Sequence, residues 1–272
     1  MNGTPLKLGI AGIGAIGMAV ARKIDGGAVP GIVLSAVAVR DRAKAAAKLA
    51  DIGSKPRLVS LPELAEHANV VLECIPGAHF AEVARPAVEH GRIFMPLSVG
   101  QLLDHMDLVD RAKATGARII VPTGALAGLD AIRAIAEGGV ESIRIRTRKP
   151  PKGLEGAPYL RSQGISLQGL KEPLRIFEGS AREAIRGFPA NVNVAVALSL
   201  AGIGPDRTRI EIWADPAVTR NTHTIEAVSD SSNLTVTIEN IPSEENPATG
   251  KVTALSALAA LRRLTAPLVV GT

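Results

Sequence analysis

The chain has 272 residues, of which 46% are hydrophobic and 21% charged, so it is long enough for one large or two modest domains with buried cores. Aromatic residues make up only 2%, and the net charge of +5 comes from scattered Lys and Arg residues, which argues against a nucleic-acid surface. The single cysteine excludes an intramolecular disulfide, and without a signal-peptide pattern or an apolar stretch of about 18 residues we expect a cytoplasmic protein that does not bind membranes.

Short apolar runs alternate with helical patterns in the first half of the chain. The strand-like runs are Leu6–Ala11, Val33–Val39, Val70–Cys74, Ile93–Leu97 and Ala117–Val121. The helical patterns are Ile13–Ile24, Arg42–Ala50, Leu61–His67, His79–Glu89 and Gln101–Thr115. Near-continuous apolar strands separated by helices predict a parallel sheet covered on both faces. We therefore expect an α/β fold with a doubly wound Rossmann domain over residues 1–140.

A different pattern begins near Ser142, where Ile and Thr at 143, 145 and 147 alternate with Arg at 144, 146 and 148. This alternation predicts a half-exposed strand of the kind that antiparallel sheets use. Further strands are expected at Thr208–Trp213, Thr222–Val228 and Leu234–Glu239, and helices at Ala181–Arg186, Asn193–Leu200 and Thr253–Leu264. The pattern predicts a second, smaller α+β domain with a mostly antiparallel sheet over residues 141–250, for substrate, catalysis and dimerisation. The last helix, within 250–272, can pack back onto the first domain.

The strongest local motif is Gly12-Ile13-Gly14-Ala15-Ile16-Gly17, which lies between the first strand and the first helix. In that context Gly12 permits a tight turn, Gly14 lets the backbone approach a pyrophosphate, and Gly17 lets the helix sit close to the sheet. The helix N-terminus adds partial positive charge. The motif therefore predicts a dinucleotide site that includes Ala15 and Ile16.

The residues that read the cofactor ribose are expected after the second strand, at Val39-Arg40-Asp41-Arg42. Asp41 can accept from the ribose 2′-hydroxyl of NAD, or can cap the next helix. Arg40 and Arg42 can instead hold the 2′-phosphate of NADP. The tetrapeptide carries both signals and leaves NAD and NADP as alternatives.

Loops beyond the carboxyl ends of later strands are expected near the nicotinamide ribose. They contain Cys74, which has no partner that suggests a nucleophile and is interpreted as a passive lining residue. The other two loops are Ser98-Val99-Gly100 and Pro122-Thr123-Gly124-Ala125. The sequence shows no metal-ligand spacing, so no metal site is expected.

Hydride transfer belongs to the cofactor, and the protein must supply proton handling, for which histidine is suited near neutral pH. Of the five histidines, His79 follows a strand close to the expected cofactor, and His223 lies on a strand of the second domain. The pattern leaves both as candidates. Asn191, in a stretch with two asparagines after a proline, can be a helix cap, a cofactor partner, or both.

The chain resembles the L-aspartate dehydrogenase family along essentially its whole length. The motifs that carry the resemblance are the glycine motif 12–17, Leu97-Ser98-Val99-Gly100, Thr123-Gly124-Ala125-Leu126-Ala127-Gly128-Leu129-Asp130, Thr147-Arg148-Lys149-Pro150-Pro151, Phe177-Glu178-Gly179-Ser180-Ala181-Arg182-Glu183-Ala184, Phe188-Pro189-Ala190-Asn191-Val192-Asn193-Val194, Asn221-Thr222-His223 and Asn246-Pro247. The stretches from Phe177 to Asn193 and around His223 are far more specific than the glycine motif.

The resemblance implies an NAD(P)-dependent amino-acid dehydrogenase acting on the CH–NH2 group, a type linked to pyridine nucleotide biosynthesis in some organisms. It implies that His223 is the proton donor and acceptor, that Ala125 and Asn191 contact the cofactor, and that the protein is a homodimer. The implied reaction is reversible oxidative deamination of L-aspartate to oxaloacetate and ammonia through iminosuccinate. The two substrate carboxylates need cationic or N–H partners, for which Ser98, Arg148 and Lys149 are candidates.

Two alternatives stay open. The loop Ile75–Ala78 departs from the family pattern, so an oxidoreductase of the same two-domain plan could act on another small amino or hydroxy acid. A cofactor-binding sensor without catalysis is the other alternative. Sugar dehydrogenases of this plan carry a Glu-Lys-Pro here, and the lysine is absent from Glu73-Cys74-Ile75-Pro76.

Overall fold

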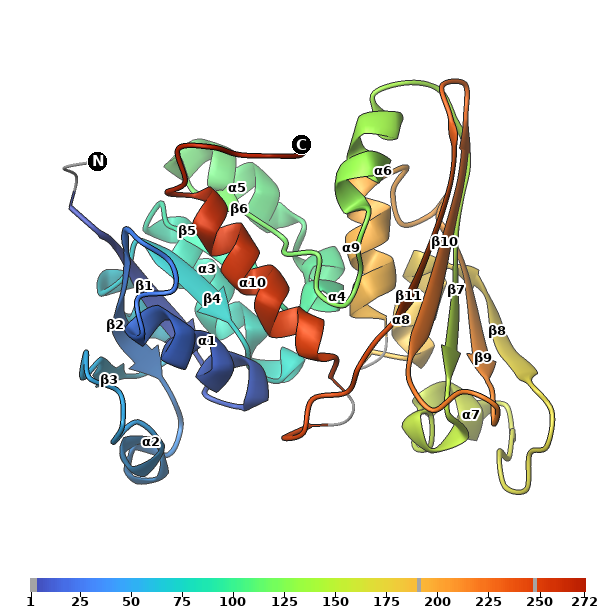
Figure 1. Ribbon diagram of the computed structural model, residues 1–272, viewed down its shortest axis with the longest axis horizontal. Helices are drawn as coiled ribbons and strands as arrows, with labels where there is room; N and C mark the ends of the chain where they lie inside the picture. The colour runs from blue at the N-terminus through green and yellow to red at the C-terminus, as the bar shows by residue number, and fades with distance from the viewer. Residues whose placement is uncertain (1–3, 190–191, 247–248) are drawn as a thin grey trace. The chain divides into compact units, whose positions relative to one another are not determined.

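The computed structural model describes residues 4–189, 192–246 and 249–272, and the chain divides into two compact units (Figure 1). The first unit comprises Met1–Pro122 and Thr253–Val269, and the second comprises Thr123–Val252 and Val270–Thr272. The first boundary thus falls after residue 122, whereas the sequence pattern suggested 140. Within the described residues, no helix has both the length and the apolar character needed to cross a membrane.

The first unit is built on a six-stranded parallel sheet. Its strands are β1 (Leu6–Ala11), β2 (Ile32–Ala38), β3 (Arg57–Val59), β4 (Val70–Glu73), β5 (Ile93–Pro96) and β6 (Arg118–Ile119), in the order β3-β2-β1-β4-β5-β6. This order confirms the predicted doubly wound Rossmann sheet and places the topological switch point between β1 and β4. Ligands of such sheets bind beyond the carboxyl ends of the strands at that point.

Helices cover both faces of this sheet, as Figure 1 shows. On one face lie α1 (Ala15–Asp25) and α10 (Lys251–Arg263), and on the other lie α3 (Phe80–Glu89) and α5 (Asp107–Thr115). The shorter helices are α2 (Arg42–Lys48), α4 (Val99–Leu102) and the 3-10 segments η1 (Pro62–Glu66), η2 (Gly77–His79) and η3 (Leu103–His105). The near-continuous burial of the strands explains their uninterrupted apolar sequences.

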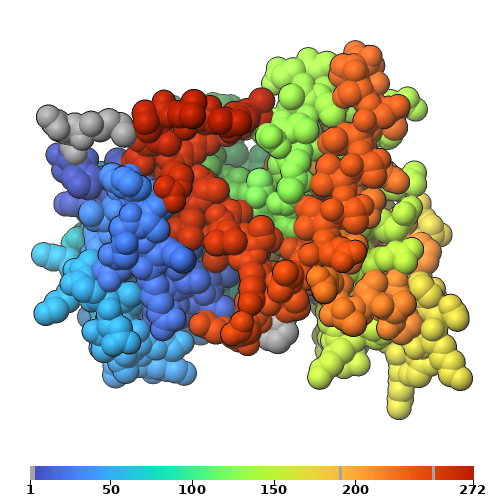
Figure 2. Space-filling model, in the orientation of Figure 1, coloured from blue at the N-terminus to red at the C-terminus, as the bar shows by residue number. Residues whose placement is uncertain are grey.

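Helix α10 completes the core of the first unit although it comes from the end of the chain. Ala257 and Leu261 are fully buried in the cluster that contains Leu8 and Ile10 of β1. Beyond the helix, the Thr265 hydroxyl donates to the Pro30 carbonyl at 2.8 Å. Figure 2 shows the red C-terminal segment lying against the blue N-terminal elements. The first unit is therefore discontinuous in sequence.

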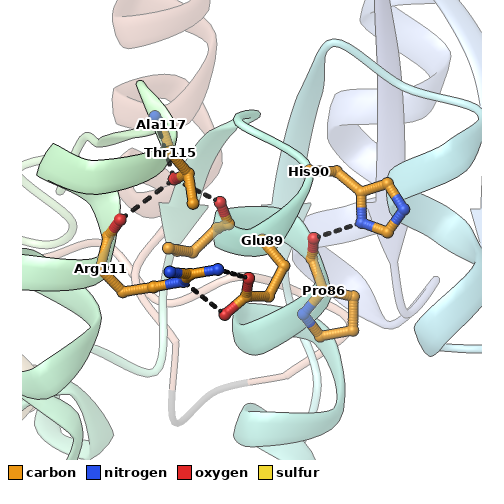
Figure 3. A network of polar contacts seen from close by, with 7 residues as sticks. Pro86, Glu89, His90, Arg111, Thr115 and Ala117 are labelled. Atoms are coloured by element: carbon orange, nitrogen blue, oxygen red, sulfur yellow. Dashed lines mark hydrogen bonds and ion pairs between the residues drawn. The ribbon is translucent and has the colours of Figure 1, made fainter.

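On the opposite face, polar contacts join α3 to α5 (Figure 3). The Arg111 guanidinium binds both carboxylate oxygens of Glu89, and the Thr115 hydroxyl donates to the Val88 carbonyl at 2.7 Å. The His90 ring, directly after α3, bonds through Nδ1 to the carbonyl of Pro86 in that helix at 2.8 Å. These contacts lie on an exposed face and hold the two helices together with little stabilisation from each ion pair.

The second unit is built on a five-stranded sheet. Its strands are β7 (Val140–Lys149), β8 (Leu174–Ser180), β9 (Arg209–Ala214), β10 (Thr222–Ser229) and β11 (Asn233–Glu239), in the order β11-β10-β7-β9-β8. Only the β7–β9 pair is parallel, so the prediction of a mostly antiparallel sheet is confirmed. The helices are α6 (Leu129–Ala136), α7 (Pro158–Ser162), α8 (Ala181–Gly187) and α9 (Asn193–Ala201), with the 3-10 segment η4 (Pro151–Gly153).

The two faces of this sheet differ in character. Ile143 and Ile145 of β7 are fully buried, and a Cβ added to Gly202, directly after α9, would lie 2.4 Å from Ile143 Cδ1. The face that carries these isoleucines is thus packed against α6 and α9. Because side chains alternate along a strand, Thr147 and Lys149 share this face, whereas Arg144, Arg146 and Arg148 lie on the other.

Candidate active site

The glycine turn of the first unit has the geometry of a dinucleotide cradle. Gly12 has φ +88°, and a Cβ there would lie 2.8 Å from the Cys74 carbonyl oxygen. A Cβ on Gly17 would lie 2.0 Å from the Gly12 carbonyl oxygen, so α1 can pack this closely only with glycine. A Cβ on Gly14 would meet no atom within 4 Å. The backbone at Gly14 is therefore open to a diphosphate, and Ala15 begins the helix behind it.

The exit of β2 lies beside this turn, because the Gly12 amide donates to the Ala38 carbonyl at 2.9 Å. Arg40 and Asp41 follow directly. The Asp41 carboxylate accepts from the Lys44 amide at 2.9 Å and so acts as the N-cap of α2. Both predicted ribose-reading residues thus lie next to the glycine turn.

A buried carboxylate joins the loops that follow β4 and β5. Glu73 is fully buried, and it accepts from the Ile75 and Ser98 amides at 2.9 Å, the Leu97 amide at 3.2 Å and the Ser98 hydroxyl at 3.0 Å. Burial raises the pKa of Glu73, while these hydrogen bonds act in the opposite direction. The carboxylate therefore fixes both loops at the carboxyl edge of the sheet, a role that the sequence analysis missed.

Two predicted site residues, Ser98 and Cys74, belong to these loops. The Ser98 hydroxyl lies 3.0 Å from a Glu73 oxygen and 3.0 Å from the Ile75 carbonyl, so its hydrogen bonds are made inside the first unit. Burial, together with the charge of Glu73, raises the pKa of the Cys74 thiol well above its usual value. A thiol held protonated is a poor nucleophile, which agrees with a passive lining role for Cys74.

The second unit buries a histidine beside a hydroxyl and a lysine. His223 of β10 lies directly opposite Thr147 of β7, and its Nδ1 is 3.0 Å from the Thr147 hydroxyl oxygen. Only 3% of His223 and 6% of Lys149 are exposed. Lys149 stands two residues beyond Thr147 on the same strand face, at a diagonal position to His223.

Burial and charge shift the protonation of this pair. Burial, with a smaller contribution from the Lys149 charge, lowers the pKa of His223 from 6.5 to about 3. Burial alone lowers the pKa of Lys149 from 10.5 to about 8. At neutral pH the site therefore presents an uncharged imidazole next to an ammonium that gives up its proton more easily than usual.

A row of polar groups extends the site toward Ala125. The Asn240 amide donates to the Asn221 carbonyl at 2.9 Å, and the Asn240 side chain donates to the Ala125 carbonyl at 3.1 Å. Among the described residues, the buried Oδ1 of Asn240 has no hydrogen-bond donor. Asn240, which the sequence analysis did not select, therefore links Ala125 to the segment directly before His223.

Other predicted residues are placed differently. The Arg148 guanidinium lies on the sheet face opposite to His223, bonds to the buried Asp215 at 3.0 Å and stacks over Trp213. Arg148 and His223 are therefore not brought together. The His79 ring bonds to Glu82 on the surface of the first unit at 2.7 Å. Asn191 lies outside the described residues.

Family models match both parts of the chain. The model described as aspartate dehydrogenase, C-terminal, matches residues 130–264, and the model described as homoserine dehydrogenase, NAD binding domain, matches residues 12–122. The second match indicates a nicotinamide cofactor, in agreement with the geometry of the glycine turn.

Solved structures share the architecture. The aspartate dehydrogenase of Thermotoga maritima superposes with a TM-score of 0.73 at 26% identity, covering 98% of this chain and 99% of that one. A scyllo-inositol dehydrogenase of Lactobacillus casei, at 15% identity and a TM-score of 0.56, covers 97% and 88% and shares the fold alone.

Curated relatives identify the family of this chain. An L-aspartate dehydrogenase of Bradyrhizobium diazoefficiens is 53% identical over 98% of this chain and 94% of its own length. The L-aspartate dehydrogenase 3 of Bordetella bronchiseptica is 51% identical over 98% of both chains. With identity at this level over nearly its whole length, the chain belongs to the L-aspartate dehydrogenase family.

Proposed function

We propose that the protein catalyses the reversible oxidative deamination of L-aspartate. L-Aspartate, NAD(P)+ and water would give oxaloacetate, ammonia and NAD(P)H, with iminosuccinate as the intermediate. The observation that carries the proposal is the buried, uncharged His223 beside the Lys149 ammonium, in a chain with close relatives of that name. A proton acceptor next to a cation suits a substrate that is an anion and must lose protons.

The first unit would hold the cofactor. We assign Gly12, Gly14 and Gly17, with Ala15 and Ile16 at the start of α1, to the diphosphate. Arg40 and Asp41 are assigned to the adenosine ribose, and Cys74, Ala125 and Asn191 to the nicotinamide half. When bound, the cofactor would supply a hydride acceptor for the substrate Cα, and residues of the chain would transfer the protons as water adds and ammonia leaves.

His223 would move the protons. The Thr147 hydroxyl contacts Nδ1 and so orients the ring. In the tautomer whose Nδ1–H donates to this hydroxyl, Nε2 is left as the acceptor. Nε2 can then take a proton from the water that attacks the imine carbon. In the reverse direction the imidazolium returns that proton.

Lys149 would bind a substrate carboxylate. A buried ammonium forms a strong charge-assisted hydrogen bond with a carboxylate. The added negative charge raises the pKa of both Lys149 and His223, because it favours their protonated forms. Substrate binding would thus bring the imidazole, with a pKa of about 3 in the free protein, closer to the range useful for a base. Ser98 and Arg148 make their hydrogen bonds elsewhere, so they are not included.

The test is a reductive amination assay with oxaloacetate, ammonium and either NADH or NADPH, followed by the loss of reduced-nicotinamide absorbance. We expect turnover in the native protein and a loss of about 100-fold or more in His223→Ala. The matched control is His90→Ala, which should cause no change, because the exposed His90 ring bonds to the Pro86 carbonyl of α3 in the first unit. Pyruvate with ammonium, and oxaloacetate without it, test for another amino or hydroxy acid. Confirmed cofactor binding without ammonium-dependent oxidation would contradict the proposal.

The family resemblance also leads us to propose a homodimer in the cytoplasm. Light scattering coupled to gel filtration would give the mass in solution, and a monomer at all concentrations would contradict the first part. Cell fractionation tests the second part.

A further inference from the structure

Asn240 directly follows β11 and continues the sheet face that carries His223. His223 pairs with Ile238, and side chains alternate along a strand, so Asn240 shares that face at a diagonal position to His223. The Asn240 amide donates to the Asn221 carbonyl at 2.9 Å, which extends the pairing of the two strands by one residue. Only 4% of Asn240 is exposed. The imidazole therefore has a buried polar neighbour on the side of β11.

The two ends of the Asn240 carboxamide are used differently. Nδ2 donates to the Ala125 carbonyl at 3.1 Å, whereas the buried Oδ1 has no donor among the described residues. A Cβ on Gly250 would lie 2.9 Å from Oδ1, so the glycine leaves this oxygen uncovered on that side. A buried carbonyl oxygen without a donor is costly, and in a binding site the ligand can supply the missing donor.

Lys149 and Asn240 lie on opposite sides of His223 along the same face. The register of β7 and β10, continued by one residue, sets Lys149 opposite Asn221, which in turn is opposite Asn240. Two strand spacings separate Lys149 from Asn240, about 10 Å between their Cα atoms. A cation, an imidazole and an uncommitted hydrogen-bond acceptor thus follow one another across the face. This order matches a small amino acid whose carboxylate meets the cation and whose nitrogen meets the acceptor.

We infer that Asn240 determines the specificity of the site for nitrogen: its Oδ1 accepts from the N–H of the substrate amino group and of the protonated imine. This inference rests on the proposed function and names a specificity residue of that same site. The protonated imine offers N–H donors and a positive charge to the carbonyl oxygen. The ketone of oxaloacetate offers only an acceptor, which Oδ1 repels. Asn240 therefore favours reduction of the imine to aspartate over reduction of the ketone to malate.

The test measures the ratio of aspartate to malate formed from oxaloacetate, ammonium and reduced cofactor, with both products separated by chromatography. Asn240→Leu keeps a similar shape and removes the acceptor, so the ratio should fall by about 10- to 100-fold. The matched control Asn233→Leu makes the same substitution at the exposed start of β11 and should keep the native ratio.

Asn240→Asp separates the acceptor from the contact with Ala125. Both Asn240→Asp and Asn240→Leu lack the Nδ2 donor to the Ala125 carbonyl, but only Asn240→Asp keeps an oxygen acceptor. The aspartate variant should therefore keep the native product ratio or exceed it. Equal losses of the ratio in the two variants would mean that Asn240 acts only by holding Ala125, and would overturn the inference.

A second measurement uses succinate, which has the two carboxylates of aspartate and no nitrogen. In the oxidative direction, the inhibition constant of succinate divided by the KM of aspartate reports how strongly the site prefers the amino group. This quotient should fall about tenfold or more in Asn240→Leu and rise in Asn240→Asp, whose charge strengthens the bond to an ammonium. If Asn240→Leu does not fold, the aspartate variant decides, and an unchanged or lower quotient would overturn the inference.

The remaining outcomes separate this inference from the proposed function. Normal ammonium-dependent turnover in the native protein, with an unchanged product ratio in Asn240→Leu, would overturn the role of Asn240 alone. Absence of ammonium-dependent turnover in the native protein would overturn both.

Discussion

Replacing Lys149 by methionine should make the protein more stable and less active. In the folded state this ammonium is buried and largely excluded from water, and the desolvation lowers the pKa of Lys149 from 10.5 to about 8. At about 1.4 kcal/mol for each pH unit of displacement, this corresponds to about 3 kcal/mol of free energy of unfolding lost at pH 7. Methionine has a similar length and no charge, so Lys149→Met should recover much of that free energy.

The pH dependence distinguishes this cause from better packing. Below pH 8 both states of the native protein carry the proton, so the full penalty is present. Between pH 8 and 10.5 the folded state releases the proton that the unfolded state keeps, so the stability of the native protein rises with pH. The advantage of Lys149→Met should therefore be about 3 kcal/mol at pH 7 and shrink toward zero near pH 10.5.

The assay is urea unfolding of the native protein, Lys149→Met and the exposed control Lys152→Met at pH 7, 8.5 and 10. Lys152→Met should change stability by less than about 0.5 kcal/mol. Steady-state kinetics should show a higher KM for aspartate in Lys149→Met only. A Lys149→Met protein that is less stable than the native one, or whose advantage does not depend on pH, would refute the account of a desolvated cation.

Three further changes test other parts of the structure. The pKa of His223 is about 3 in the folded state and 6.5 in the unfolded chain, so the free energy of unfolding should fall by up to about 1.4 kcal/mol for each pH unit below 6.5. Urea titrations of His223→Asn should lack this histidine-dependent fall. In Glu73→Gln the new NH2 group would face backbone amides that are also donors, so the free energy of unfolding should fall by about 1–3 kcal/mol. An unchanged melting temperature would argue against a role of Glu73 in joining the loops after β4 and β5. Gly14→Ala meets open space in the protein but would obstruct a diphosphate, so calorimetry should show weaker NAD(P)H binding at an unchanged melting temperature.

The first sheet was predictable because its strands are buried on both sides and read as apolar runs. The exception is β3 (Arg57–Val59), which has three residues, only one of them buried, and leaves no periodic signal. In the second unit β8 (Leu174–Ser180) escaped prediction, because an irregularity between Arg175 and Phe177 breaks the alternation of buried and exposed positions. Short elements and bulges remove the periodicity on which such predictions depend.

The site was predictable only in part, because its residues meet through pairing between distant strands. The alternation along β7 already implies that Arg148 and Lys149 face opposite ways, so at most one of them can lie beside His223. Which one does depends on the register that sets His223 opposite Thr147. The contact of Asn240 with Ala125 joins residues far apart in the chain, so no local sequence pattern predicts it.

The late return of α10 to the first unit has a consequence for synthesis in the cell. The nucleotide-binding sheet emerges first from the ribosome, but the surface that Ala257 and Leu261 cover stays open until nearly the entire polypeptide has been made. The second unit can form earlier, because most of its elements lie within one uninterrupted stretch. An N-terminal fragment ending at residue 122 should accordingly expose apolar surface and aggregate, and a circular permutant that begins with α10 should relieve the delay.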